Sequence, residues 1–313
     1  MRRPVCRVLT GPTASGKSAL ALRLAQKMGW EILCMDSMQI YRGMDIGTAK
    51  PTPQERQAVP HHLLDLRDPR EGFTVSDYRE AAEQTVDRLH GEGREVLFVG
   101  GTVLYLQALM HPMAMGNVPP DPALRDALRR LAETEQGKQA LAERLRSLDP
   151  ETARRLPLND VRRIIRAIEV SEATGIPFSR QPDREGPARY EWRVVSTAME
   201  RDRLYARINR RAEVMLREGL QEEVAGLLAA GVPENAQSMQ GLGYKEMIPV
   251  VRGRASPEEA LEAIRTGSRH YAKRQMTFLR REPAVRYVDA ERPDAGDRIL
   301  AMLETETDGS PAL

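Results

Sequence analysis

Residues 11–18 read GPTASGKS, and this segment fits the phosphate-loop pattern G-x-x-x-x-G-K-[ST]. An apolar stretch, Val5–Thr10, precedes it, and residues 16–28 carry Ala and Leu at helical spacing. A strand, this loop and a helix in that order bring backbone N–H groups and a helix N-terminus together around an anion. The sequence therefore predicts a diphosphate-binding loop, and the question is whose diphosphate it binds.

The predicted diphosphate site is the loop itself, which consists of Gly11, Pro12, Thr13, Ala14, Ser15, Gly16, Lys17 and Ser18. Lys17 adds a positive charge to the backbone donors. The hydroxyl of Ser18 is placed to hold a Mg²⁺ ion that bridges two phosphate groups. We therefore expect Mg²⁺ as the cofactor, with Ser18 as its protein ligand.

Strand and helix patterns alternate through the first third of the chain, which is typical of a parallel α/β sheet. Further strands are predicted at residues 31–35, 62–66 and 95–99. Ser76 is the expected N-cap of a helix that ends at His90. Beyond residue 115 the patterns are helical at 121–133, 138–147 and 159–174, and strand patterns return at 190–199 and 285–288.

These patterns predict an α/β fold: a P-loop NTPase-like parallel sheet core, flanked by helices and interrupted by a helical insertion domain. We expect the discontinuous catalytic core at residues 1–115 and 187–290 and the insertion at 116–186. From Asp289 the chain carries seven acidic residues against two arginines. Residues 291–313 are therefore expected to form an acidic, partly disordered C-terminal tail.

Composition limits the function classes. The chain has 313 residues, 41% of them hydrophobic, and a net charge of +2. No run of eighteen apolar residues occurs, and the first strand begins too early for the apolar region of a signal peptide, so we expect no membrane span. Two cysteines, Cys6 and Cys34, are too few for a disulfide framework, so we expect a cytoplasmic protein.

Cationic side chains cluster in two places, although the chain has only six lysines against 41 arginines. Residues 154–166 hold five arginines and one acid, and residues 265–281 hold six Lys or Arg residues and no acid. Arg265, Arg269 and Lys273 recur every four residues, which places them on one helix face. A solvated face normally mixes charges, whereas a face of one sign interleaved with aromatic residues favours a polyanion such as nucleic acid.

Asp36 follows the second predicted strand, at the carboxyl edge of the sheet where open α/β folds bind ligands. Its carboxylate can hold Mg²⁺ or accept a proton, or it can cap the next turn together with Ser37. Residues 100–102 (GGT) end the fourth strand without an acid, unlike motor-type NTPases. Three interpretations remain from this chemistry: a metabolite kinase, a nucleic-acid-directed transferase that discards a diphosphate, and a nucleotide-binding regulator.

Several longer motifs have a more specific resemblance. They are DSMQIYRGMDIGTAKP at 36–51, GGTVLY at 100–105, NDVRRIIRAIEV at 159–170, GLGYKEM at 241–247 and YAKRQMTF at 271–278. In order and spacing the chain resembles the tRNA dimethylallyltransferases, also called tRNA isopentenyltransferases or the IPP transferase family. The resemblance covers nearly the whole chain.

The resemblance implies transfer of a dimethylallyl group from dimethylallyl diphosphate to the exocyclic N6 amine of an adenosine. That adenosine lies immediately 3′ of the anticodon in tRNAs that read codons starting with U, and diphosphate is released. The loop then binds the diphosphate of the donor, and no ATP is consumed. The implied partners are dimethylallyl diphosphate and the tRNA anticodon stem-loop, which the insertion would contact, and a monomer suffices. Two alternatives remain: a small-metabolite kinase of the shikimate or gluconate type, and a pure tRNA-binding module that binds RNA without consuming the diphosphate.

The resemblance also implies residue roles. Asp36 matches the general base, Thr13 and Arg207 match catalytic residues that contact the diphosphate, and Arg211 is a second diphosphate ligand one helical turn from Arg207. The implied tRNA contacts are Asp36, Ser37, Met38, Gln39, Thr102, Arg125, Arg162, Arg163, Ile164, Ile165, Arg166, Arg269, Lys273 and Arg274. Two positions depart from the family pattern: Arg162 stands where Gln is usual, and Phe278 where Trp is usual.

Overall fold

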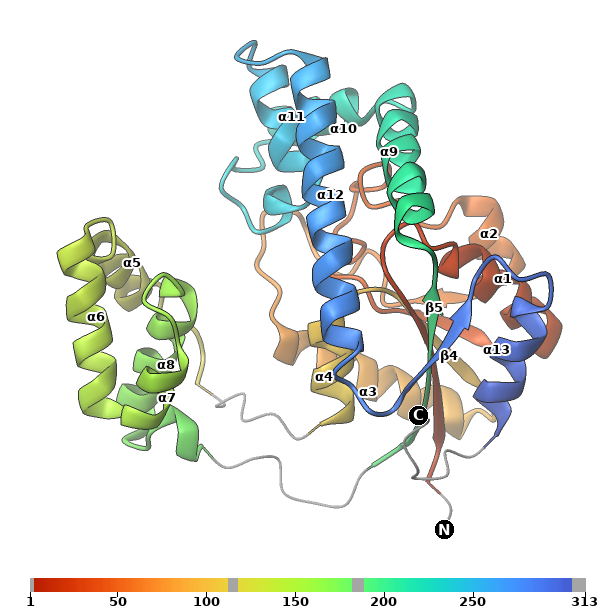
Figure 1. Cartoon of the computed structure of the whole chain (residues 1–313), viewed down its shortest axis with the longest axis horizontal. Helices are drawn as coiled ribbons and strands as arrows, with labels where there is room; N and C mark the ends of the chain where they lie inside the picture. Colours follow the sequence, from red (N-terminus) through yellow and green to blue (C-terminus); the bar gives the residue numbers. More distant parts are fainter. Residues whose placement is uncertain (1–2, 112–117, 182–188, 306–313) are drawn as a thin grey trace. The chain divides into compact units, whose positions relative to one another are not determined.

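The computed structural model describes residues 3–111, 118–181 and 189–305 (Figure 1). The chain divides into two compact units, Met1–Met110 with Ala188–Leu313, and His111–Pro187. We call them the core unit and the helical unit. The sequence boundaries at 115/116 and 186/187 lie close to this division.

A six-stranded sheet forms the centre of the core unit, in the order β3-β2-β4-β1-β5-β6. Every strand pair is parallel. Strands β1, β2 and β4 are buried on both faces and mostly apolar, whereas the edge strand β6 mixes buried and more exposed residues. The predicted P-loop-type parallel sheet is confirmed. The strands are β1 (Val5–Thr10), β2 (Glu31–Cys34), β3 (His61–His62), β4 (Val96–Val99), β5 (Glu191–Ala198) and β6 (Val285–Asp289).

Helices cover both faces of the sheet. On one face α1 (Lys17–Met28) and α13 (Ala295–Glu304) bury Leu20, Leu24, Ile299 and Leu303 against strand residues. On the other face α3 (Val75–Gly91) and α4 (Val103–Met110) join the larger core, where the rings of Tyr78 and Tyr105 stack with centroids 3.7 Å apart. A short helix, α2 (Pro53–Ala58), follows the loop after β2.

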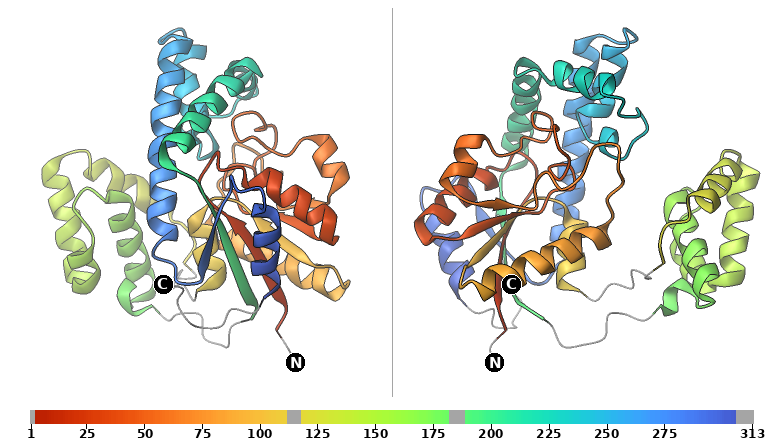
Figure 2. Two further views of the ribbon diagram at one scale, coloured as in Figure 1. Left: turned by 45° about the vertical axis from the view of Figure 1, so that its right-hand side comes forward. Right: turned by 180° about the vertical axis from the view of Figure 1, so that it is seen from behind.

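Four further helices rise past the carboxyl ends of the strands (Figures 1 and 2). They are α9 (Arg201–Arg217), α10 (Leu220–Ala229), α11 (Tyr244–Val251) and α12 (Pro257–Leu279), with a short 3₁₀ turn at Ser238–Gln240. Helix α9 starts three residues after β5 ends, and α12 packs against both α9 and α4. The carboxyl edge of the sheet is therefore enclosed by helices, and this enclosure forms the site.

The helical unit contains α5 (Pro122–Leu131), α6 (Glu135–Leu148), α7 (Pro150–Arg155), α8 (Val161–Thr174) and a 3₁₀ turn at Phe178–Arg180. Polar N-caps start the helices: Asp121, Thr134, Asp149 and Asp160 each accept a hydrogen bond from a backbone N–H in the first turn. A small apolar core lies between them. Helix α7 was not predicted from the sequence.

Two local predictions are wrong. Helix α3 is capped by Thr74, not Ser76, because Thr74 and Asp77 form a reciprocal capping box. The third strand ends at His62 instead of Leu66, because Leu63 and Asp65 have positive φ angles of 63° and 56°, which turn the chain out of the sheet.

The acidic tail expected at 291–313 is also corrected. Residues 295–304 form α13, whose Ala295, Ile299 and Leu303 recur every four residues and are buried against the sheet. The acidic side chains lie between these positions, so the charge count hid an amphipathic helix. The last eight positions lie outside the described residues. No helix among the described residues is long and apolar enough to cross a membrane.

Candidate active site at the carboxyl edge of the sheet

The phosphate loop connects β1 to α1 in a left-handed backbone conformation. Gly11, Ala14 and Gly16 have φ angles of 143°, 63° and 88°. A Cβ on Gly11 would lie 2.1 Å from Thr197 Oγ1, so only glycine fits there. The hydroxyls of Ser15 and Thr197 lie 2.6 Å apart, which fixes the loop to β5. The backbone donors at the start of α1 are therefore held in place before a ligand binds.

Three cationic side chains surround this loop. Arg207 Nε donates to Ala14 O at 2.8 Å, and Lys17 Nζ donates to Pro12 O at 3.3 Å. Arg211 Nη2 reaches Thr48 O at 3.4 Å. Burial and, to a smaller extent, the charge of Arg211 lower the pKa of Lys17 to about 8, against the opposing effect of Asp36. Three cations gathered on one wall of a cavity make a strong site for a polyanion such as diphosphate.

Asp36 lies at the end of β2, beside the loop. Its Oδ1 accepts from Met38 N at 2.9 Å, so the carboxylate does cap the turn. Among the described residues none donates a hydrogen bond to Oδ2, and the side chain lines a cavity. Ser37 N donates to Thr102 Oγ1 at 3.0 Å, which holds this loop against the turn after β4. Capping and a chemical role are therefore compatible.

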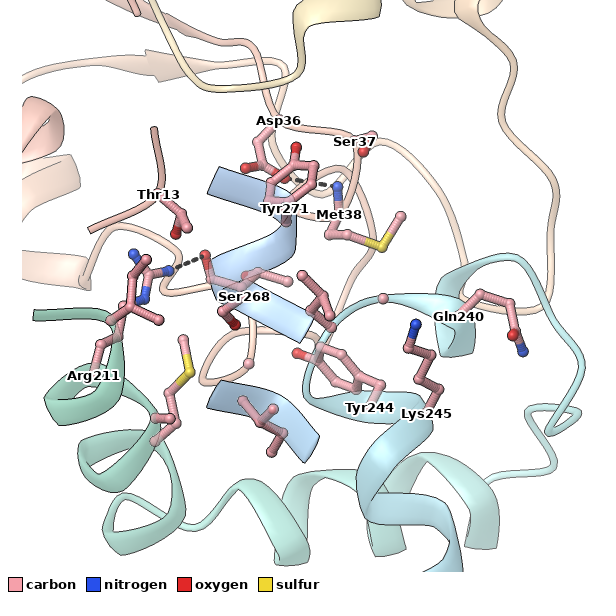
Figure 3. A pocket seen from close by; sticks show the side chains of 18 of the residues that line it. Thr13, Asp36, Ser37, Met38, Arg211, Gln240, Tyr244, Lys245, Ser268 and Tyr271 are labelled. Carbon is pink, nitrogen blue, oxygen red and sulfur yellow. Dashed lines mark hydrogen bonds between the residues drawn. The ribbon is translucent and has the colours of Figure 1, made fainter. Parts of the chain in front are cut away.

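Two cavities meet at Asp36. The larger, about 650 Å³, is lined by the phosphate loop and by Arg207, Arg210 and Arg211. The smaller, about 290 Å³, has an apolar side that includes Ile208, Ala212, Met215 and Ile264. Both are lined by Thr13, Asp36, Thr48, Arg211, Met215 and Tyr271. Figure 3 shows Thr13, Asp36, Arg211 and Tyr271 around the smaller cavity. The carboxylate can thus face a phosphate-bearing ligand on one side and a second substrate on the other.

The glycine turn after β4 is required by close contact. A Cβ on Gly100 would lie 2.0 Å from Met35 O, and one on Gly101 would lie 2.3 Å from Gln275 Nε2. Thr10 Oγ1 donates to Gly100 O at 2.9 Å. The turn is therefore packed between β1 and the loop that carries Asp36.

The residues present fit a magnesium ion that is held mainly by its substrate. The described residues contain no cluster of three or more His, Cys, Asp or Glu side chains that could hold a metal on its own. Ser18 is exposed at the start of α1, and its hydroxyl forms no hydrogen bond with the described residues. Mg²⁺ typically keeps several waters and binds through few protein groups plus substrate phosphates, which matches this donor set.

Gln39 has a structural position within its own loop. Its Nε2 donates to Thr48 O at 3.0 Å and to Ala49 O at 3.2 Å, and its Oε1 accepts from Cys34 Sγ at 3.1 Å. These bonds hold the segment that follows Asp36 in a closed loop. Gln39 also lines the larger cavity, so its expected tRNA contact stays a prediction.

In the helical unit the predicted tRNA-binding segment divides into buried and exposed residues. Ile164 and Ile165 are 2% and 4% exposed in the small apolar core, which corrects their assignment to a tRNA surface. Ile168, four and three positions further on, lies in the same core, because residues at these spacings share a helix face. Arg162 and Arg163, by contrast, are exposed.

Arg125 and Arg166 converge on one buried acid. Arg125 donates to both carboxylate oxygens of Glu169 at 2.8 and 2.7 Å, and Arg166 Nη1 lies 2.5 Å from Glu169 Oε2. Glu169 is 1% exposed. The hydrogen bonds from Arg125, Asp121 N and Arg166 outweigh burial and hold the pKa of Glu169 below its usual range. These arginines stabilise the helical unit, whatever else they contact.

On α12 the predicted one-sign charge stripe is wrong in its first half. Arg265 pairs with Glu213 of α9 at 2.5 Å, and Arg269 pairs with Glu262 at 3.0 Å. These acids lie outside the segment counted in the sequence. Lys273 and Arg274 are exposed, and Arg274 lines the smaller cavity.

Sequence reasoning gave no role to Gln275, Thr197 or Glu223. Glu223 of α10 accepts from the backbone N of Asp45 and Ile46 at 2.9 and 2.8 Å and from Tyr244 Oη at 2.6 Å. It therefore fixes the loop that forms one wall of the smaller cavity. Gln275 lies within the motif at 271–278, which could have drawn attention to it. Thr197 and Glu223 are single polar residues in ordinary strand and helix patterns, so the sequence carried no signal for them.

Comparisons with known proteins agree with this geometry. A family model described as IPP transferase matches residues 39–282. A tRNA dimethylallyltransferase of Limosilactobacillus fermentum is 46% identical over 284 residues, which cover 90% of this chain and 91% of that protein.

Solved structures give the same relationship. The full-length tRNA isopentenylpyrophosphate transferase of Bacillus halodurans is 38% identical, with a TM-score of 0.70 over 96% of this chain and 97% of the other. A eukaryotic dimethylallyltransferase, described in crystallographic snapshots as acting on tRNA, is 25% identical, with a TM-score of 0.78 over 96% of this chain and 78% of the other. With a family model that spans most of it and relatives this similar, the chain belongs to the IPP transferase family.

Proposed function

We propose that the protein transfers the dimethylallyl group of dimethylallyl diphosphate to tRNA, at N6 of the adenosine immediately 3′ of the anticodon in tRNAs that read codons starting with U. One observation carries this proposal: Asp36 lies where a cation-lined phosphate cavity meets a second, partly apolar cavity. A donor diphosphate and an acceptor base can approach the same carboxylate from these two sides. The names of the relatives, tRNA dimethylallyltransferases, support the choice of donor and acceptor.

The diphosphate side accounts for departure of the leaving group. The bond between the allylic carbon and the diphosphate oxygen breaks, and negative charge grows on the diphosphate. Lys17, Arg207 and Arg211, with the N-terminus of α1, are fixed where that charge develops. Interactions that strengthen with the growing charge stabilise the transition state more than the bound donor.

On the acceptor side Asp36 serves as the general base. The N6 atom forms a bond to the allylic carbon, and the carboxylate takes the proton that N6 loses. An aromatic amine is a weak nucleophile, so orientation contributes as much as proton removal. The Met38 N–H and the contact between Ser37 and Thr102 hold the carboxylate loop in place for this step.

A divalent metal, for which Mg²⁺ is our proposal, would be held by Ser18 and by the diphosphate. It would neutralise charge on the leaving group.

The proposed tRNA contacts are the accessible members of the predicted set. In the core unit they are the half-buried Ser37 and Met38, which line the smaller cavity, and the exposed Lys273 and Arg274; in the helical unit they are the exposed Arg162 and Arg163. Thr102 is buried and supports Ser37 through its hydroxyl. The target adenosine has to leave the anticodon-loop stack to enter a cavity, as in other enzymes that act on a base. We further propose that the protein acts as a monomer in the cytoplasm.

A small-metabolite kinase is less well supported. It would use the same loop for ATP and the second cavity for its acceptor, but it does not need a helical unit with exposed arginines. The relatives are named transferases of a prenyl group and not kinases.

A transfer assay tests the function directly. Labelled dimethylallyl diphosphate, Mg²⁺ and an unmodified tRNA with adenosine 3′ of its anticodon would be incubated with wild type and with Asp36→Asn, and ATP added as a competing donor. We expect label in the RNA with wild type and a loss of about 10²-fold or more with Asp36→Asn while tRNA binding persists. Phosphorylation of a small acceptor from ATP, without label in RNA, would establish the kinase instead.

A further inference from the structure

The turn after β4 joins the phosphate loop to the loop that carries Asp36. On one side, Thr10 at the end of β1 donates from Oγ1 to Gly100 O at 2.9 Å. On the other side, Ser37 donates from its backbone N to Thr102 Oγ1 at 3.0 Å. A shift of this turn therefore changes the distance between the two halves of the site.

A buried amide on α12 holds the same turn to the phosphate loop. Gln275 Oε1 accepts from Thr13 N at 2.9 Å, and Gln275 Nε2 donates to Gly101 O at 2.7 Å. The side chain is 2% exposed. The close approach requires glycine at 101, because a Cβ there would lie 2.3 Å from Nε2.

Any buried carboxamide has to be hydrogen-bonded, so the presence of hydrogen bonds does not by itself give Gln275 a role in the reaction. The identity of its partners does suggest a role. Thr13 and Gly101 belong to two separate loops, and neither bond satisfies α12 itself. An apolar side chain of similar size could fill the space without holding the loops at a fixed spacing.

We propose that Gln275 is a positioning residue for the transfer reaction. Its amide sets the spacing between the phosphate loop and the Gly100–Thr102 turn, and through that turn the spacing between the donor diphosphate and Asp36. The inference rests on the diphosphate and base roles proposed above. A misplacement of about 1 Å in a reacting pair can lower the rate about 10²-fold, so such a bridge has a measurable effect.

Two substitutions at Gln275 separate positioning from packing. Gln275→Leu keeps the approximate size but removes both hydrogen bonds. Gln275→Glu keeps the shape, and its neutral form has one acceptor oxygen and one O–H donor, which replace both bonds. Its ionised form turns an acceptor toward Gly101 O. Burial and that carbonyl raise the pKa of the introduced carboxyl.

We expect Gln275→Leu to lower kcat about 10²-fold with a much smaller change in KM for either substrate. For Gln275→Glu, the ratio of its kcat to that of wild type should rise several-fold as pH falls from about 8.5 to about 6, because the neutral acid restores the bridge. Taking this ratio removes the titrations that wild type shares. They belong to the other ionisable groups of the same cavity: Lys17, Cys34, Asp36, Glu55, His61, Arg207, Arg210, Arg211, Glu218 and Tyr271.

Gln237→Glu is the control for the substitution itself, at an exposed position outside both cavities. Gln237 also bridges backbone groups, since it accepts from Phe73 N at 3.3 Å and donates to Phe73 O at 2.8 Å, but it lines neither cavity. Its kcat ratio to wild type should stay near one and flat with pH.

Thermal unfolding measured for each variant completes the test. If Gln275→Leu folds and keeps a kcat within about twofold of wild type, Gln275 only packs and the positioning role is refuted. If that variant does not fold, a pH-independent ratio for Gln275→Glu refutes it equally. Absence of transfer by the wild type itself would refute the proposed function, which is a different result.

Discussion

Helices α8 and α12 carry similar runs of arginine in the sequence, but the ion-pair partners of these arginines differ in the structure. On α8 the cation nearest the core, Arg166, bonds to the buried Glu169 of the same helix, while Arg162 and Arg163 are exposed. On α12 the neutralising acids are surface residues, one of them on α9, and the exposed cations are Lys273 and Arg274.

The difference separates two uses of charge. In the helical unit an ion pair is part of the core, because a buried carboxylate has no water and needs its arginines. On α12 the pairs lie on the surface, where they contribute little to stability but reduce the net charge offered to an RNA. A cluster of like charges in a sequence therefore does not show which members remain for a ligand.

The largest effect is expected from removing the buried carboxylate of the helical unit. Glu169→Ala leaves Arg125 and Arg166 without their shared anion inside the helical unit. We expect the free energy of unfolding of that unit to fall by about 3 kcal/mol. Denaturant unfolding followed by circular dichroism measures it. Glu262→Ala is the surface control and should leave stability nearly unchanged; equal losses for both variants would show that burial does not distinguish the two helices.

A second prediction contrasts a cation inside the cavity with those on the helices. The pKa of Lys17 is lowered to about 8, so in the free enzyme its ammonium group loses its proton as pH rises above that value. The value of kcat/KM for dimethylallyl diphosphate should then fall toward tenfold per pH unit above about 8. The corresponding decline of kcat with rising pH should begin at a higher pH, because bound diphosphate favours the charged form of Lys17.

Steady-state kinetics across the pH range checks this, with Lys17→Arg as the comparison. A guanidinium stays charged throughout, so the basic limb due to Lys17 should disappear even if overall activity is lower. An unchanged limb in Lys17→Arg would assign it to another group.

A smaller effect is expected where the exposed cations are removed. Lys273→Ala and Arg162→Ala should each weaken tRNA binding several-fold and lower the slope of log affinity against log salt concentration by about 1. Filter binding at several salt concentrations measures both quantities. Binding that is insensitive to either substitution would remove that helix from the proposed RNA surface.

The smallest effect is expected for a cation of α12 that is already in an ion pair. Arg265 already pairs with Glu213 and Glu262, so Arg265→Ala should change neither tRNA affinity nor the salt slope appreciably. The same binding titration, run beside Lys273→Ala, decides it. A loss as large as that of Lys273→Ala would mean that the ion pairs open when RNA binds.

Much of the fold could be predicted because its signals are local. Apolar runs gave the strands, and the phosphate loop was recognisable because its glycines and Lys17 act within eight consecutive residues. Failures occurred where two local signals competed. Thr74 and Ser76 are both good N-caps, and only the reciprocal bond with Asp77 selects Thr74. In α13 the acidic count outweighed a four-residue apolar spacing.

The site was predicted unevenly for a related reason. Asp36 and the phosphate loop follow strand ends, and parallel strands bring their carboxyl ends to one edge, so their proximity could be expected. The buried positions of Ile164 and Ile165 could have been inferred from helical spacing, but motif resemblance marked the whole segment as tRNA-binding.

By itself the sequence determined the parallel sheet, the diphosphate loop, the candidate base and the family resemblance, because each depends on residues close together in the chain or on an ordered set of motifs. Only the tertiary structure decided which cations are paired, which are exposed, and which buried amide joins the two halves of the site. Thr13 and Gln275 are 262 positions apart, yet they share a hydrogen bond. The physical reason is that hydrogen-bond and ion-pair partners are chosen by distance in the folded chain, and no local pattern encodes that distance.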